Sequence, residues 1–274
     1  MPAIRPAAVA GLFYPEEPEL LRAVVEDLLA EVPAGSPAEP RGTWPKAIIA
    51  PHAGYVYSGP VAARAYATLR PGRGTIRRAV LVGPSHCVGF AGVAAPRATE
   101  FETPLGALRI DLAARDAIAD LPQVRIDDGP HAEEHSLEVQ LPFLQLVLGE
   151  VAILPLVVGE AGPASVAAVL ERVWDGRETV VIVSSDLSHF HPDDEARAID
   201  ARTAEWIEAY EPARIGPEEA CGCRPIGGLL ETARARDLAI RRLDLRTSGQ
   251  TSGSRRRVVG YGAWALSEPA AQPS

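Results

Sequence analysis

The stretch Ala47-Ile-Ile-Ala-Pro-His52 is a short apolar segment that runs directly into a histidine. Two later stretches repeat the pattern, Ala79-Val-Leu-Val-Gly-Pro-Ser-His86 and Val180-Val-Ile-Val-Ser-Ser-Asp-Leu-Ser-His189. Continuous apolar runs of this kind are typical of strands that are buried in a parallel sheet, and ligands bind beyond the carboxyl ends of such strands. The sequence therefore predicts that these three histidines meet at one edge of a sheet.

Strands and helices are expected to alternate along the rest of the chain. Apolar residues at helical spacing between Leu20 and Leu29 predict an amphipathic helix. The predicted strands are residues 47–50, 79–82, 151–158, 180–184 and 257–265. The further predicted helices are residues 61–69, 112–119, 134–148, 164–174, 194–210 and 226–234, with Pro142 inside the third. This order predicts one three-layer α/β/α domain over residues 1–274, with a mostly parallel or mixed sheet and a flexible tail from Ser267.

Composition narrows the class of protein. The net charge is -9 and the basic cluster Arg255-Arg256-Arg257 is short, so neither nucleic-acid binding nor membrane-surface binding is expected. Three cysteines are too few for a disulfide framework in a chain of 274 residues, which favours a reducing compartment. The chain shows no secretory signal peptide and no apolar run near the ~20 residues that span a bilayer. We therefore expect a cytoplasmic protein.

The third strand end adds a carboxylate, Asp186, near His189. One histidine after a strand is most often a structural residue, but its repetition at three strand ends favours a shared metal or substrate site. An aspartate can orient an imidazole and raise its pKa, which suits general acid–base catalysis near neutral pH. A Ser-His-Asp hydrolase is the rival interpretation, and the chain lacks the Gly-x-Ser-x-Gly motif of many such enzymes.

Two further patterns contain candidate ligands. Cys221-Gly-Cys223 precedes a predicted helix, whose dipole lowers the pKa of a nearby thiol, so one cysteine is a candidate thiolate ligand and a buried structural thiol is the alternative. His131-Ala-Glu-Glu-His135 matches the His-x-x-Glu-His motif of a class of zinc-dependent hydrolases. Because Gly129-Pro130 places His131 at or before the helix start, a supporting or substrate-binding role for Glu134 and His135 is favoured.

Several motifs occur together in one order along nearly the whole chain, and the set is more specific than any single motif. They are Arg5-Pro-Ala-Ala-Val-Ala-Gly-Leu-Phe-Tyr-Pro15, Pro51-His-Ala-Gly-Tyr-Val-Tyr-Ser-Gly59, Gly83-Pro-Ser-His86, Glu134-His-Ser-Leu-Glu-Val-Gln-Leu-Pro-Phe-Leu-Gln145, Ser184-Ser-Asp-Leu-Ser-His-Phe190, Cys221-Gly-Cys-Arg-Pro-Ile226 and Val259-Gly-Tyr261. In this set the chain resembles the Memo family, whose bacterial and archaeal members are often called AmmeMemoRadiSam system protein B.

The resemblance implies a fold like that of the class III extradiol dioxygenases, with one metal ion bound at the strand ends. It implies three metal ligands, which are His52, His86 and Cys221 in this sequence. It also implies that His189 is the acid–base residue, and that the residues facing or supporting the same pocket are Asp186, Glu134 and His135.

The implied ligand set departs from that of true extradiol dioxygenases, which hold iron(II) with two histidines and a carboxylate. A thiolate in place of the carboxylate shifts preference toward zinc, copper(I) or thiolate-tolerant iron. Cys223 stands where a non-thiol is more usual in the family, which leaves open a redox pair with Cys221, an alternative ligand, or a small buried core residue.

The leading expectation is a mononuclear metal-binding protein with a dioxygenase-like oxidoreductase pocket, with iron as the first metal and copper or zinc as alternatives. A second hypothesis is a non-catalytic adaptor that binds anionic or phosphorylated peptides through the same pocket, and a third is a zinc-dependent hydrolase. The family name also implies radical-SAM and Ammecr-like protein partners in a modification pathway. The chain has no Cys-x3-Cys-x2-Cys motif, so radical chemistry would come from the partner. The sequence does not specify whether the substrate is a small molecule or a peptide.

Overall fold

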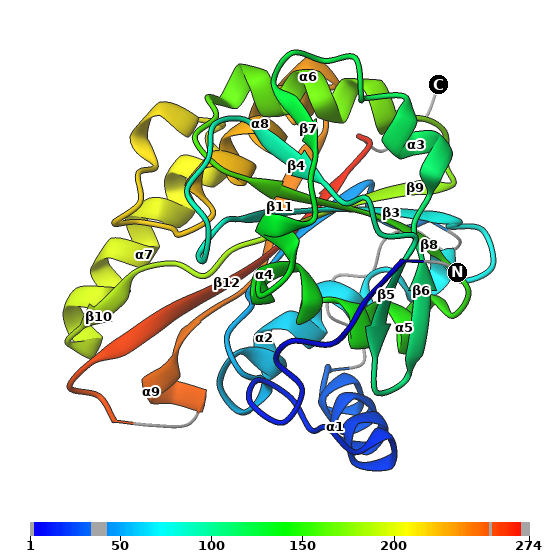
Figure 1. Cartoon of the computed structure of the whole chain (residues 1–274). Helices are drawn as coiled ribbons and strands as arrows, with labels where there is room; N and C mark the ends of the chain where they lie inside the picture. Colours follow the sequence, from blue (N-terminus) through cyan, green and yellow to red (C-terminus); the bar gives the residue numbers. More distant parts are fainter. Residues whose placement is uncertain (1–2, 34–42, 252–253, 270–274) are drawn as a thin grey trace, which may run out of the picture.

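A nine-stranded mixed sheet runs through the centre of the computed structural model, which describes residues 3–33, 43–251 and 254–269 (Figure 1). The strand order is β10-β12-β2-β9-β3-β8-β4-β7, and β11 pairs with β12. These strands are β2 (Ala47–Ala50), β3 (Arg78–Pro84), β4 (Val93–Ala95), β7 (Val124–Ile126), β8 (Ala152–Val158), β9 (Thr179–Ser184), β10 (His189–His191), β11 (Ala239–Thr247) and β12 (Val258–Ser267). A smaller sheet contains β1 (Ile4–Arg5), β5 (Glu100–Thr103) and β6 (Gly106–Arg109).

The four central strands β2, β9, β3 and β8 are parallel to one another. Ala50 at the end of β2 pairs with Ser184 at the end of β9, and Val82 in β3 pairs with Val183. The carboxyl ends of these strands therefore meet at one edge of the sheet, as the apolar runs predicted. Beyond the central strands, β12 joins β2 in antiparallel fashion and β4 joins β8 in antiparallel fashion, so the sheet is mixed.

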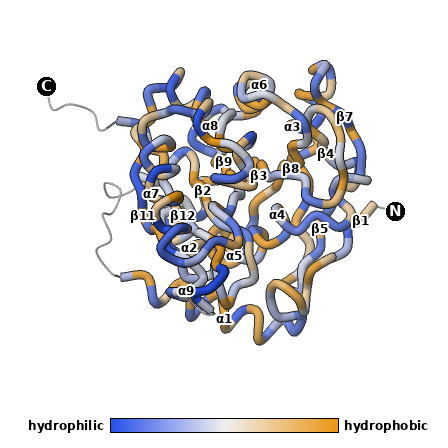
Figure 2. Tube along the Cα trace, turned by 90° about the vertical axis from the view of Figure 1, so that its left-hand side faces the viewer, coloured by the Kyte–Doolittle hydropathy of each residue, from blue (hydrophilic) through white to orange (hydrophobic). Residues whose placement is uncertain are grey.

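Helices cover both faces of the large sheet (Figure 1). One face packs on α1 (Pro18–Ala30), α2 (Tyr55–Ala67) and α5 (Leu141–Leu148), and the other on α3 (Leu112–Asp116), α6 (Pro163–Val173), α7 (Asp193–Glu208) and α8 (Cys223–Ala235). Neighbouring strand residues serve opposite cores, since Ile48 lies in the first and Ile49 in the second. Hydrophobic segments of β3 and β8 run between these layers (Figure 2). The predicted three-layer α/β/α fold is confirmed.

The structure differs from the sequence-based expectation at several boundaries. The predicted helix over residues 134–148 is split into α4 (His135–Glu138) and α5, which begins just before Pro142, where a proline is tolerated. The helix predicted over residues 61–69 is α2, which begins six residues earlier and includes Gly59; a Cβ there would lie 2.7 Å from Leu28, so glycine lets α1 pack closely. Ser267 ends β12 and is not part of a tail, and residues 270–274 of the expected tail lie outside the described residues.

The remaining short helices are η1 (Arg70–Gly72), η2 (Gly129–His131), η3 (Pro212–Arg214) and α9 (Ser248–Thr251). Within the described ranges, no helix combines the length and the apolar character needed to cross a bilayer.

Candidate metal centre

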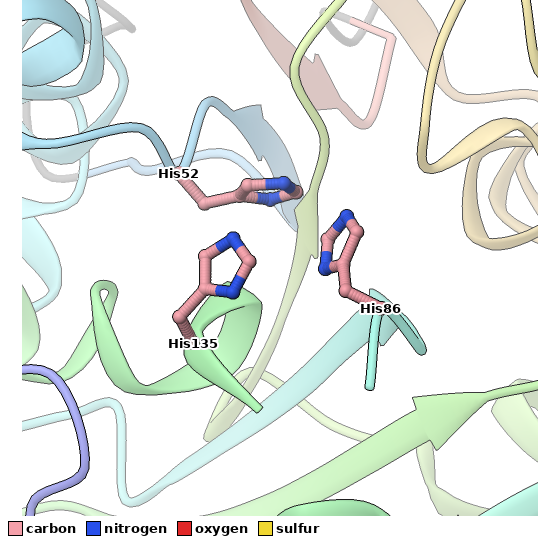
Figure 3. A group of neighbouring side chains, drawn as sticks. All are labelled: His52, His86 and His135. Atoms are coloured by element: carbon pink, nitrogen blue, oxygen red, sulfur yellow. The ribbon is translucent and has the colours of Figure 1, made fainter. Parts of the chain in front are cut away.

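Three histidines from three different elements face one another at the carboxyl edge of the sheet (Figure 3). His52 follows β2, His86 follows β3, and His135 is the first residue of α4. One ring nitrogen from each lies within 4.8 Å of the others, which is a grouping able to hold a metal ion. The His52 side chain is buried, that of His135 is half-buried and that of His86 is exposed, so the cluster opens to solvent on the His86 side.

A buried polar network fixes the tautomer of His52. The Ser184 hydroxyl donates its one proton to the Ser136 carbonyl at 2.6 Å and accepts a hydrogen bond from the Gln140 amide at 2.8 Å. Toward His52 Nδ1, 2.8 Å away, this hydroxyl can therefore only accept, so Nδ1 carries the proton. The unprotonated Nε2 of His52 then faces the cluster, which is the form of imidazole that ligates a metal.

Glu134 fixes the tautomer of His86 in the same way. Its carboxylate accepts hydrogen bonds from His86 Nδ1 at 2.9 Å, from the His86 amide at 2.6 Å and from the Ser136 amide at 2.9 Å. Burial alone raises the pKa of the Glu134 carboxyl, but the bonds from His86 and Ser136 outweigh burial and hold this pKa at about 2. An ionised carboxylate only accepts, so His86 Nδ1 is protonated and Nε2 is the ring nitrogen that faces the cluster. Carboxylate–histidine pairs of this kind commonly support metal ligands.

Glu134→Gln is expected to weaken metal binding about 10–100-fold. Both carboxylate oxygens of Glu134 accept from N–H groups, so the NH2 group of glutamine would face one of these donors and the His86 ring would lose part of its support. Competition with a chromophoric chelator measures this change directly. The matched control is Glu133→Gln at the exposed neighbouring position, which is expected to bind metal like the wild type.

Cys221 lies on the opposite side of His52 from Ser184. Its Sγ is 3.3 Å from His52 Nε2 and 3.6 Å from the Asp186 carbonyl. The expected lowering of its pKa by the dipole of α8 is wrong: burial and the neighbouring Asp186 raise the pKa of this thiol instead. Cys223, the first residue of α8, is buried in the apolar core between the sheet and the helices α6 and α8. Of the three alternatives for this residue, its position fits a small buried core residue.

Burial also controls the protonation of the imidazoles. It lowers the pKa of His52 well below the usual value, with a further contribution from the neighbouring His86 and His135, and it lowers the pKa of His135 and of His189. These rings are therefore neutral near pH 7, which is the state that a metal requires. These three neutral rings supply no positive charge to a phosphorylated peptide.

Asp186 has a different task from the one expected. Its buried carboxylate accepts a hydrogen bond from the His52 amide at 2.7 Å, and burial raises its pKa to about 7 against this opposing bond. The contacts of the described residues include no bond from Asp186 to the His189 ring, which is held by the Leu187 carbonyl. Asp186 thus fixes the backbone that presents His52, and the expected orientation of His189 by Asp186 is not formed.

Asp200 of α7 supports the loop before His189, since its Oδ1 accepts a hydrogen bond from the Ser188 amide at 3.0 Å. Burial raises the pKa of Asp200 to about 6, with the Ser188 bond opposing the shift. A carboxyl whose pKa is higher in the folded state contributes most to stability below pH ~4, and that contribution is lost as pH rises through about 6.

Asp200→Asn is therefore expected to become more stable relative to the wild type as pH rises from 4 to 7, by about 2–3 kcal/mol in the free energy of unfolding. Urea denaturation across this pH range measures the difference. The exposed Asp194 of the same helix is the control, and Asp194→Asn should track the wild type throughout. A difference that is constant with pH would show that Asp200 does not titrate in this range.

His131 does not join the cluster. It ends the 3-10 turn η2, its ring is buried, and its Nε2 is 3.1 Å from the Ala94 carbonyl while Phe101 packs against its edge. His131 and His135 thus lie on separate elements, and the His-x-x-Glu-His motif does not form a two-histidine zinc site on one helix.

Sequence reasoning missed two residues of the His52 network, Gln140 and Ser184. Gln140 donates to the Pro51 carbonyl at 3.0 Å and to Ser184, and its own oxygen accepts from Tyr66 at 2.8 Å. Both residues occur within the motifs of the family resemblance, which was the one available signal. Their role depends on contacts between residues far apart in sequence, and no local pattern reports such contacts.

Comparison with known proteins agrees with the motifs. A family model described as "Memo-like protein" matches residues 5–265. A MEMO1 family protein of Methanopyrus kandleri is 36% identical over 94% of this chain and 97% of its own length, and one of Ignicoccus hospitalis is 35% identical over 95% and 97%. An uncharacterized protein of Escherichia coli K12 has a similar fold, with a TM-score of 0.50 at 11% identity, covering 80% of this chain and 98% of that one. The chain therefore belongs to the Memo family.

Proposed function

We propose that this protein binds one metal ion, with iron(II) as the resident metal, in a dioxygenase-like oxidoreductase pocket. The observation that carries the proposal is a pair of imidazoles whose Nδ1 atoms are held by buried partners, Ser184 for His52 and Glu134 for His86, which leaves the two Nε2 atoms to face the cluster. Such support of the second ring nitrogen is characteristic of histidines that bind a metal.

We propose Cys221 as the third ligand. An imidazole nitrogen and a thiolate sulfur that bind the same metal ion lie roughly 3.5 Å apart. The distance of 3.3 Å from Cys221 Sγ to His52 Nε2 already fits this requirement. The grouping of His135 with His52 and His86 supports a second arrangement, in which three histidines hold the ion.

The other side chains of the pocket then have separate roles. A bound metal would supply Lewis-acid polarisation of a substrate oxygen or activation of oxygen. His189 has a lowered pKa because of burial, so it is neutral near pH 7 and able to accept a proton from a bound substrate. Asp186 and Ser184 hold His52 from its backbone and its ring, respectively, and so keep the ligand geometry fixed.

Elemental analysis by mass spectrometry tests the proposal, on protein purified anaerobically without chelator or affinity metal. We expect about one equivalent of metal in the wild type and its loss in His52→Ala, because one ligand of three is removed. The control is His189→Ala, which removes a nearby imidazole of the same edge and should keep the metal. The proposal would be refuted if the folded wild-type protein contained no metal and also took up no iron, zinc or copper on titration.

A further inference from the structure

A cavity of about 120 Å³ lies directly beside the candidate metal centre. His86 and Cys221 are among its lining residues, so the cavity shares its wall with the metal centre. Its position is set by two backbone segments that bond to each other, since the Glu160 amide donates to the Phe90 carbonyl at 2.7 Å and the Gly159 amide to the Gly92 carbonyl at 2.9 Å. A Cβ at Gly159 would lie 2.1 Å from the Phe90 carbonyl oxygen, so these segments can approach only because residue 159 is glycine.

Apolar side chains form one part of the cavity wall. The apolar lining side chains are Pro84, Val88, Phe90, Val158 and Pro225. An enclosed apolar cavity of about 150 Å³ in another protein accepts benzene. The present cavity is smaller but open to solvent, so it can take one planar ring of that size with an edge of the ring exposed. Val88 is 39% exposed, which leaves the cavity accessible from solvent.

One arginine lines the same cavity. Arg224 lies in the first turn of α8, three residues after Cys221, and its Nη2 donates to Glu160 Oε2 at 2.6 Å. Among the lining residues these are the one guanidinium and the one carboxylate. The two side chains are 37% and 74% exposed, and an ion pair this exposed contributes little to stability, so a ligand carboxylate can take the place of Glu160 on Arg224.

We propose that this cavity is a substrate subsite for a small planar carboxylate of about the size of benzoate. The ring lies on the apolar wall, the carboxylate binds Arg224 in exchange for Glu160, and the ring edge away from the carboxylate faces His86 and Cys221. The subsite adds a substrate class to the proposed function. It rests on that function in one respect only, which is that the ring edge beside His86 and Cys221 then faces a metal ion.

The test uses benzoate and its neutral isostere benzamide, with affinities measured by ligand-observed NMR on the full chain, once after complete chelation and once loaded with zinc. We expect the wild type to bind benzoate more tightly than benzamide. Arg224→Gln should lose about tenfold or more in benzoate affinity and leave benzamide affinity unchanged, because a charge-assisted pair is removed. Glu160→Gln should raise benzoate affinity, because it removes the competing carboxylate.

The matched control is Arg236→Gln, which removes an arginine that pairs with exposed Glu171 just after the same helix. It should bind benzoate like the wild type. The subsite is overturned if the wild type and Arg224→Gln bind benzoate with equal affinity, or if the wild type binds benzoate and benzamide with equal affinity. If Arg224→Gln does not fold, Glu160→Gln decides, and unchanged or weaker benzoate binding in that variant overturns the subsite. Arg224-dependent binding in chelated protein that takes up no metal supports the subsite and defeats the metal proposal. Benzoate binding that requires zinc and is unchanged in Arg224→Gln supports the metal proposal and overturns the subsite.

Discussion

Glu138→Ala is expected to lower the free energy of unfolding by about 3–5 kcal/mol, because it leaves the charge of Arg5 buried without its partner. The Glu138 carboxylate is fully buried and pairs with the Arg5 guanidinium, whose side chain is 5% exposed. It also accepts hydrogen bonds from the Ala8 amide at 2.8 Å, the Val9 amide at 3.0 Å and the Tyr14 hydroxyl. One side chain of α4 therefore binds much of the segment from residue 5 to residue 14.

The loss should reach the candidate metal centre, since α4 also begins with His135. Arg5 donates to the carbonyls of His131 at 2.8 Å and Glu134 at 2.9 Å, so the N-terminal segment holds the turn that presents Glu134 to His86. We therefore expect Glu138→Ala to weaken metal binding as well as to unfold more readily in urea.

Glu171→Ala is the control for Glu138→Ala. It breaks an exposed carboxylate–arginine pair and is expected to change the free energy of unfolding by about 1 kcal/mol or less. Similar small losses in both variants would contradict the assignment of Glu138 as the anchor of the N-terminal segment.

The sequence predicted the parts of the fold that one local pattern can report. β2 was predicted over Ala47–Ala50, which are its bounds in the structure. A strand that is buried on both faces is apolar throughout, so its two ends are marked where the apolar run ends. β11 was missed, because its residues, Ala-Ile-Arg-Arg-Leu-Asp-Leu-Arg-Thr, are largely half-buried and carry three arginines. Its strand conformation comes from pairing with β12, a contact that the local sequence does not contain.

The same distinction applies to the candidate site. His52 and His86 could be predicted because each follows a recognisable strand, and parallel strands bring their ends together. The Arg5–Glu138 pair joins residues 133 positions apart, and Arg5 and Glu138 taken singly look like ordinary surface charges. The helix dipole suggested a low pKa for the Cys221 thiol, whereas burial, which depends on the whole fold, raises it.

Cys221→Ala is expected to weaken metal binding by at least about 100-fold, and His135→Ala to leave it near the wild-type value. The reason is geometric: Cys221 Sγ is already at ligand spacing from His52 Nε2, at 3.3 Å, whereas the cluster that includes His135 spans up to 4.8 Å. His135 also lacks a bonded partner as close as those of the other two rings, since its Nδ1 is 3.6 Å from Glu134 Oε1.

Cobalt(II) substitution gives a second readout, because a thiolate ligand produces an intense charge-transfer absorption in the near ultraviolet that imidazoles do not. The wild type and His135→Ala should show this band, and Cys221→Ala should lack it. Cys223→Ala is the matched control, since it removes a thiol two residues away whose side chain lies in the apolar core, and its band should be unchanged. Metal binding that survives in Cys221→Ala and disappears in His135→Ala would replace the proposed thiolate site with a three-histidine site. In that case the metal would lie farther from Cys221, and the ligand of the proposed subsite would face the ion from a different position.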